Sequence, residues 1–314
     1  MNREMSVHHA ADSSAFEEIA AVYNAANGLD NPDHTDLDGD YFKQSYSIPD
    51  VDITRDVMLV RNKIGRAVAF GAILPVMGRA YPSSLLTMYV HPAFRQAGIG
   101  SQLLGNLIAG AQDKGASKVT CNVPSFRPAA ISFLEKRGFR PIREWAKLVH
   151  TDIGNIHGQT GSTKLTYRTI EDRDAGKWAS LQNSLFKGSF NYREVTPEDY
   201  VRKTQADTFC RDLALFGLCE GHTIAYCIGT LLGPMGSQVG ERRLVIDGIG
   251  VTPHFRRHGF GSSILNEILV RAASMGVKRS ELIVDTVDFP ASMMYKAACY
   301  RERYKRIWYE CKLT

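Results

Sequence analysis

A twelve-residue stretch occurs twice in this chain, and this repeat constrains the fold more than any other feature. The first copy runs from Val90 to Ser101 and the second from Val251 to Ser262, an offset of 161 residues. Both copies read V-x-P-x-F-R-x-x-G-x-G-S, with seven of twelve positions identical. Solenoid repeats have periods of about 20–50 residues, so this spacing predicts a duplicated domain. The 314 residues are enough for two domains of ordinary size.

The elements predicted from hydrophobic spacing repeat in the same order. In each half a strand and helical segments precede three strands, and the motif leads into a helix, a strand, a second helix and a final strand pair. The strands expected before the motif are 57–61, 67–76 and 85–90, then 213–219, 223–232 and 243–251. The helices expected are 13–24, 100–114 and 128–137, then 174–186, 197–209, 261–275 and 290–298. This succession predicts an α+β domain with a mixed α/β sheet, used twice.

A stretch without periodicity separates the two halves. Residues 151–163 carry three glycines and are typical of a linker. We therefore expect an N-terminal domain over residues 1–150 and a C-terminal domain over residues 164–314.

Composition and charge argue against several classes of protein. Hydrophobic residues make up 44% of the chain, yet no apolar run approaches the roughly 18 residues of a membrane span. The first residues lack the apolar segment of a secretion signal. A net charge of +5 without a long Lys/Arg block argues against nucleic acid as a partner. Six cysteines without zinc spacing predict reduced thiols and no metal site. We expect a cytoplasmic protein that binds neither nucleic acid nor membrane.

The repeated motif is suited to binding an anion. Its proline ends the preceding strand, and its two glycines permit backbone conformations closed to other residues. The amides of residues 96–101 and 257–262 then point outward at the beginning of a helix, where the dipole favours an anion. Arg95 and Arg256 would add a positive charge, so a diphosphate is the expected ligand. A dinucleotide-binding motif is a poorer interpretation, because neither copy has its third glycine.

Each copy has V-x-P before R-x-x-G-x-G. A strand follows, and then a helix that ends at Gly138-Phe139 in the first copy and before Tyr300 in the second. This pattern resembles the GCN5-related N-acetyltransferases (GNAT). The layout resembles the two-domain, mycothiol synthase-like members. The resemblance implies two tandem acyl-CoA N-acyltransferase domains with acetyl-CoA as cosubstrate. It also implies that the strand before the loop carries a bulge and splays from its neighbour, and that the pantetheine lies in the gap. The implied cofactor-binding residues are Met88, Val90, Arg95, Gln96, Ala97, Gly98, Ile99, Gly100 and Ser101, then Ile249, Val251, Arg256, Arg257, His258, Gly259, Phe260, Gly261, Ser262 and Asp288.

Acetyl transfer to an amine needs a base for the ammonium and an acid for the leaving thiolate. The resemblance implies Tyr295 as the acid, since the family has a tyrosine at this place on the helix. Asp247 lies four residues before Val251 and is the candidate base or substrate anchor. Each has a structural alternative, a core tyrosine and a solvated carboxylate at a strand edge. At Asp288 the family often has Asn, so its carry-over is weaker.

The first copy lacks both catalytic candidates. Leu134 aligns with Tyr295, Leu86 aligns with Asp247, and Arg127 aligns with Asp288. We therefore expect an N-terminal domain that binds acetyl-CoA but is catalytically degenerate, and a catalytic C-terminal domain.

The acceptor is less constrained. An N-acetyltransferase acting on a primary amine of a small molecule is the first hypothesis. A non-catalytic acyl-CoA sensor and a protein lysine or N-terminal acetyltransferase are the alternatives. The Asp-rich segment 30–40 could attract a cationic acceptor or be a solvated loop. The sequence leaves the oligomeric state open.

Overall fold

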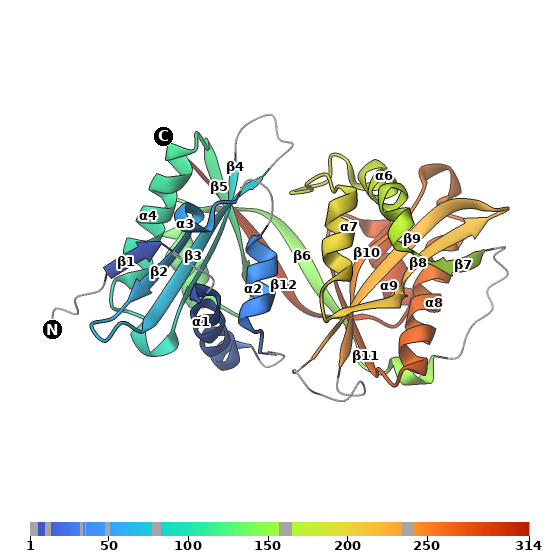
Figure 1. Cartoon of the computed structure of the whole chain (residues 1–314), viewed down its shortest axis with the longest axis horizontal. Coiled ribbons are helices and arrows are strands. Elements are labelled where there is room, and N and C mark those ends of the chain that lie inside the picture. Colours follow the sequence, from blue (N-terminus) through green and yellow to red (C-terminus); the bar gives the residue numbers. More distant parts are fainter. Residues whose placement is uncertain are drawn as a thin grey trace. The chain divides into compact units, whose positions relative to one another are not determined.

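A computed structural model of the chain describes residues 6–9, 14–31, 34, 36–47, 51–76, 83–156, 165–233 and 242–313. The chain forms two compact units, which we call unit 1 (residues 1–143 and 307–314) and unit 2 (residues 144–306) (Figure 1). Each unit has a mixed sheet with helices on both faces, as the sequence predicted. No helix in the described ranges is long and apolar enough to cross a membrane.

Unit 1 is built on a sheet with the strand order β1-β2-β3-β4-β5-β12. Its strands are β1 (Ser6–His9), β2 (Val57–Arg61), β3 (Ala67–Val76), β4 (Ser83–Val90), β5 (Lys118–Pro124) and the end of β12 (Arg301–Lys312). Its helices are α1 (Ala15–Asp30), α2 (Gly39–Tyr46), α3 (Ile53–Asp56), α4 (Ile99–Asp113) and α5 (Pro128–Glu135). Strands β1 to β4 pair antiparallel, and β4 pairs with β5 in parallel.

Alternation along the strands of unit 1 produces two apolar faces. One face, with Val60 and Ile73, packs on the apolar sides of α4 and α5. The other, with Leu59 and Phe70, packs on α1 and α2. Because side chains of a strand alternate between faces, both faces are buried only when helices cover each of them. The result is a three-layer unit with the sheet in the middle.

Unit 2 repeats this plan with the strand order β6-β11-β10-β9-β8-β7. Its strands are the end of β6 (Arg140–His150), β7 (Thr166–Thr169), β8 (Phe209–Cys219), β9 (His222–Leu232), β10 (Arg243–Val251) and β11 (Arg279–Asp285). Its helices are α6 (Ala175–Phe186), α7 (Pro197–Thr204), α8 (Phe260–Ser274) and α9 (Phe289–Ala297). Helices α8 and α9 cover one face of the sheet, and α6 and α7 cover the other.

The strand that ends the first half of the sequence, β6, joins the sheet of unit 2. The strand that ends the second half, β12, joins the sheet of unit 1. Strand β6 pairs with β11 through residues 145–150, and its Ala146 and Leu148 belong to the core of unit 2. The end of β12 lies next to β5, and Tyr309, 2% exposed, belongs to the core of unit 1. Both strands are exposed and basic where they begin and apolar where they enter the other unit. Each strand therefore buries its apolar end by crossing between the units.

The sequence prediction was wrong in several segments. Each half ends in one continuous strand, β6 or β12, where a strand pair was expected. Two further segments differ in their helices. Helix α1 continues to Asp30, so residues 28–30 are not part of a loop, and α2 follows in a segment for which no helix was expected. The segment 197–209 is not one helix: α7 ends at Thr204, and Phe209 begins β8. Short helices with few apolar residues carry little periodic signal, which explains both errors.

Candidate active site

The strand before each repeated loop separates from its parallel neighbour. In unit 2, β10 pairs with β11 only from Arg243 to Ile246, although β11 continues to Asp285 along β6. In unit 1, β4 pairs with β5 only from Ser83 to Leu85. Each sheet therefore splits along the end of the strand that leads into the loop, which is the splay that the family resemblance implied.

Only one of the two strands carries a bulge. The pairing of β10 with β9 shifts register between Ile246 and Gly248, which leaves Asp247 as the extra residue. The described pairs of β4 with β3 continue without a shift from Ser83 to Val90. The expected bulge is thus confirmed in unit 2 and is wrong for unit 1. A bulge redirects the side chain at that point, so Asp247 is presented at the place where the split begins.

Backbone groups at the split belong to the residues that the sequence suggested. The amide of Thr252 donates to Ile224 on β9, and the amide of His91 donates to Val68 on β3. Because successive backbone groups of a strand point to opposite sides, those of Ile249 and Val251, and of Met88 and Val90, face the split. The carbonyls of Val251 and Val90 already accept from loop arginines, so the groups left for a ligand along the split are the amides and the carbonyls of Ile249 and Met88.

Each strand ends in a short 3₁₀ turn, and a loop with left-handed residues follows. Gln96 and Arg257 have φ of 61° and 67°, and Gly98 and Gly259 have φ of 80° and 78°. Gly98 and Gly259 are the residues immediately before α4 and α8. Left-handed residues at a helix N-terminus turn successive amides toward one side, which makes an anion-binding concavity. The remaining predicted loop residues, Ala97, Ile99, Gly100, Ser101, His258, Phe260, Gly261 and Ser262, lie in the same two segments.

The loop arginines are partly used to hold the loops. Arg256 Nε donates to the carbonyl of Val251 at 3.0 Å. Arg95 Nε donates to the carbonyl of Val90 at 3.3 Å, and its Nη2 lies 2.8 Å from Asp30 Oδ2 on α1. Since Asp30 neutralises much of its charge, Arg95 fixes the loop of unit 1 more than it attracts a phosphate.

Tyr295 lies on α9 in the core beneath the split of unit 2. It is 5% exposed, and its ring meets that of Tyr300 edge to face, with 5.8 Å between centroids. Burial raises the pKa of the Tyr295 hydroxyl well above its usual range, with smaller contributions from Cys227, Tyr300 and Asp288. Such a phenol stays protonated at neutral pH and can act only as a proton donor. Its counterpart Leu134 in unit 1 is an apolar core residue, 4% exposed.

Asp247 lies on the opposite face of the same sheet, on the side of α6 and α7. Its Oδ2 accepts a hydrogen bond from Lys203 Nζ on α7 at 2.7 Å and another from the Thr230 hydroxyl. Its side chain is 28% exposed. Burial raises the pKa of Tyr226 well above its usual range, and both Tyr295 and Asp247 add to that shift.

Lys203, Thr230 and Tyr226 were not predicted from the sequence. Lys203 and Asp247 are 44 residues apart, on a helix and a strand, and no motif or repeat links them. The neighbouring glycine carried a weak signal, since a Cβ at Gly248 would lie 2.9 Å from the Tyr226 hydroxyl. A glycine inside a strand marks a bulge or a close approach, and here it marks both.

Asp288 and Arg127 occupy equivalent positions before α9 and α5 but behave differently. Asp288 Oδ1 accepts from the amide of Ala291 at 3.1 Å, so it caps its own helix. Arg127 extends to α1 and donates to the Asn27 side chain at 2.5 Å. Its guanidinium also lies over the ring of Tyr89, 5.8 Å from the centroid. Arg127 thus ties α5 to α1 across unit 1, whereas Asp288 makes no such bridge among the described contacts of unit 2.

The Asp-rich segment mostly has local partners. Asp30 binds Arg95, Asp36 lies 2.8 Å from His34, and Asp38 caps α2 through the amide of Tyr41. Asp33 lies outside the described residues. Among the described residues of the chain, no group of three or more His, Cys, Asp or Glu side chains is arranged to hold a metal ion.

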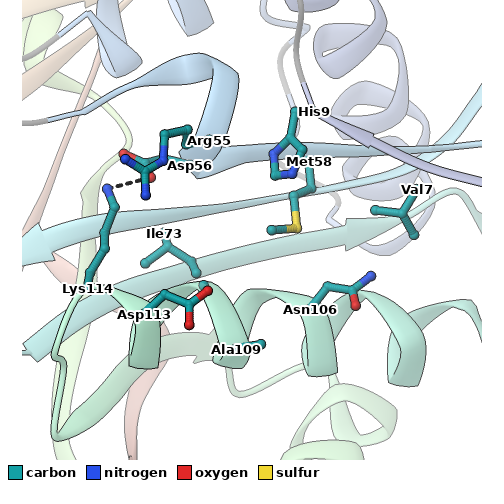
Figure 2. A pocket seen from close by; sticks show the side chains of 11 residues that line it. Val7, His9, Arg55, Asp56, Met58, Ile73, Asn106, Ala109, Asp113 and Lys114 are labelled. Atoms are coloured by element: carbon teal, nitrogen blue, oxygen red, sulfur yellow. Dashed lines mark ion pairs between the residues drawn. The ribbon is translucent and has the colours of Figure 1, made fainter.

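A separate hollow of about 460 Å³ lies in unit 1 between α4 and the β1–β3 edge of the sheet (Figure 2). It is bordered at one end by the ion pair of Lys114 with the buried Asp56, 2.5 Å apart. Ala109 and Gly110 line it, where unit 2 has Val270 and Arg271. The hollow adjoins the second half of α4, whereas the repeated loop adjoins its beginning, so the hollow is separate from the predicted anion site.

A family comparison agrees with this geometry. The model of the acetyltransferase (GNAT) family matches the chain twice, at residues 19–139 and 178–299, which together are well over half of it. The chain belongs to the GNAT family of acetyltransferases. The predicted family and the predicted tandem fold are both confirmed.

Individual relatives and solved structures are similar to this chain over most of its length. Mycothiol acetyltransferase from Thermobispora bispora is 27% identical over 218 residues, which are 67% of this chain and 70% of that protein. A GCN5-related N-acetyltransferase from Sphaerobacter thermophilus superposes with a TM-score of 0.75 at 21% identity, covering 98% of this chain and 95% of that one. A tandem GNAT protein from the clavulanic acid biosynthesis pathway has a TM-score of 0.77 at 14% identity and covers 98% of both chains. At these identities the structural likeness shows the fold.

Proposed function

We propose that this GNAT protein transfers the acetyl group of acetyl-CoA to a primary amine of a small molecule, and that unit 2 performs the reaction. The observation that carries the proposal is the position of Asp247. It is the bulged residue at the point where β10 separates from β11, and the repeated loop follows the end of the same strand. Tyr295 lies in the core on the other face of that sheet.

The donor site is argued from backbone geometry. The loop from Arg257 to Ser262 leads into the N-terminus of α8, where the first amides of a helix have no intrahelical partner, and this suits a diphosphate. The exposed backbone groups of Ile249 and Val251 suit the amides of a pantetheine arm. Acetyl-CoA would supply the activated acetyl thioester. A metal ion is not required to hold the diphosphate, since the loop amides and the helix dipole already favour an anion.

The chemistry asks two things of the chain. The carboxylate of Asp247 accepts a proton from the acceptor ammonium, directly or through water, so that a neutral amine attacks. The Tyr295 hydroxyl donates a proton to the departing thiolate; its raised pKa keeps the hydroxyl protonated at neutral pH, although it also makes the group a weaker acid. Each group is expected to contribute about 10²–10⁴ to the rate.

Unit 1 is proposed to bind the donor without efficient turnover. It keeps the split and the loop but has Leu134 in place of the tyrosine. On the acceptor side, Tyr89 stands where unit 2 has Gly250, and it packs against Phe70 and Tyr23 with centroids 5.4 and 5.0 Å away. Aromatic packing and the Arg127 bridge fill the space that an acceptor would need.

A small amine is preferred as the acceptor on two grounds. The relative from Thermobispora bispora carries the name mycothiol acetyltransferase, and Asp247 presents one carboxylate to a cation. A protein lysine or N-terminus and a non-catalytic acyl-CoA sensor are the competing hypotheses that the experiments must separate.

Donor binding is tested by calorimetric titration of acetyl-CoA into the wild type, Gly98→Glu and Gly259→Glu proteins. A glutamate in a loop repels the diphosphate and strains a left-handed position. We expect two sites in the wild type and the loss of one in each variant. A single site lost only in Gly259→Glu would remove donor binding from unit 1, and no binding by a folded wild type would overturn the proposed function.

Turnover is tested by thiol release from acetyl-CoA with a panel of small amines and lysine peptides. We expect release with a small amine and a loss of about 10²-fold or more in Tyr295→Phe and in Asp247→Asn. Unchanged rates in both variants would refute the residue assignment. Binding of acetyl-CoA without release to any acceptor would favour the sensor, and release only with peptides would favour a protein acceptor.

A further inference from the structure

The chain places one of its own primary amines at the proposed base. Lys203 Nζ lies 2.7 Å from Asp247 Oδ2, and the side chains are 32% and 28% exposed. The neighbouring cations Arg193 and Arg202 both bind Asp199 instead. Lys203 is therefore the amine that meets Asp247 in the described part of the chain, in the position that the ammonium of an acceptor would take.

The acetyl group of a bound donor would reach the same place. The split of β10 from β11 begins after Ile246 and extends to Val251, where the anion-binding loop follows. Five residues of strand span about 16 Å, a length that suits an extended pantetheine arm anchored at the loop. Such an arm ends where the split closes, beside Asp247 and hence beside Lys203.

We propose that unit 2 acetylates its own Lys203; this inference rests on the proposed function. The Lys203 ammonium gives a proton to Asp247, and its nitrogen forms a bond to the acetyl carbonyl carbon. The bond between that carbon and the sulfur of acetyl-CoA breaks. The thiolate takes a proton from Tyr295, and the second proton that the Lys203 nitrogen loses returns to Tyr295 through water. The products are an N-acetyl-lysine, free CoA and a protonated Asp247.

The modification changes the acceptor side of the site. An acetylated lysine carries no positive charge and cannot form an ion pair with Asp247. The carboxylate then loses its internal cation, keeps the hydrogen bond from Thr230, and becomes available to the ammonium of a free acceptor. Self-acetylation of Lys203 thus removes an internal cation that competes with the acceptor ammonium for Asp247.

The experiment is incubation of the full-length protein with acetyl-CoA, followed by peptide mass spectrometry of every lysine. We expect one acetyl group at Lys203, formed with a first-order rate that does not change with protein concentration, because the reaction is intramolecular. Asp247→Asn and Tyr295→Phe should slow this labelling by tenfold or more, and Lys203→Arg should abolish it. Lys177→Arg, a change at an exposed lysine on α6, should leave it unchanged.

Three results would overturn the inference. One is an unlabelled Lys203 in a protein that binds acetyl-CoA and releases thiol to a free amine, which would leave the proposed function intact. Another is labelling of Lys203 at an equal rate in Asp247→Asn, which would indicate chemical acetylation. The third is a protein that does not bind acetyl-CoA, which would overturn the proposed function as well.

Discussion

Lys147 on β6 lies 3.0 Å from the carboxylate of Glu281 on β11, where these two strands pair in unit 2. Glu281 is 3% exposed, and Arg243 Nε also approaches it, at 2.6 Å. Burial lowers the pKa of Lys147, although the charge of Glu281 opposes that shift. A buried carboxylate is tolerated because hydrogen-bonded cations surround it. The strand that ends the first half of the sequence is thus fixed electrostatically inside the second unit.

Replacing Glu281 by Gln should destabilise unit 2 strongly. The substitution keeps the size of the side chain but removes the buried negative charge that faces Lys147 and Arg243, which are themselves largely shielded from water. Removing one partner from a buried pair costs about 3–5 kcal/mol. Urea unfolding followed by hydrogen exchange should locate the loss in β6, β10 and β11. Glu302→Gln, at an exposed position of β12, is the matched control, and equal stability of the two variants would contradict this account.

A second prediction concerns the other crossing strand. Tyr309 lies near the end of the chain, but it is buried in unit 1, and its hydroxyl donates to Glu135 Oε1 at 3.1 Å. Tyr309→Ala should cost about 3–5 kcal/mol, as large aromatic deletions in cores do. The amides that lose hydrogen-exchange protection should be those of α4, β5 and α5, which lie 174 to 210 residues earlier in the chain. Loss of protection confined to residues 164–306 would show that β12 does not complete unit 1.

Much of the fold and part of the site could be predicted from the sequence. The repeat predicted the duplication and the location of both loops. Loops that bind a ligand through their backbone amides depend on glycines and prolines, which can be recognised in a short stretch of sequence. Asp247 was found by its distance from the loop, and Tyr295 by its place on the following helix. These are short-range relationships.

Long-range relationships could not be predicted. The contact of Lys203 with Asp247 depends on how α7 packs on the sheet, and no periodicity encodes it. The bulge in β10 but not in β4 depends on Gly248 and the approach of Tyr226. The sheet that β6 or β12 joins could not be predicted either. The hydrophobic pattern of each strand would be the same in either sheet, since its apolar end would be buried in both. Sequence spacing states which residues are buried but not which sheet buries them.

The bidentate contact of Arg168 with Asp174 leads to a prediction about pH. Arg168 Nη1 and Nη2 lie 2.5 and 2.8 Å from the two carboxylate oxygens. The hydrogen bonds from Arg168 lower the pKa of Asp174 from 3.8 to about 2, against the effect of burial. Because the folded-state pKa lies below the unfolded one, this stabilisation is present above about pH 4 and is lost as the pH falls toward 2.

Asp174→Asn should therefore destabilise unit 2 by up to about 2 kcal/mol at neutral pH and by progressively less in acid. Urea midpoints measured between about pH 3 and 7 test this, with Asp207→Asn as the control for the loss of one exposed charge. A difference between wild type and Asp174→Asn that stays constant over this range would mean that the Arg168 contact does not stabilise the folded unit.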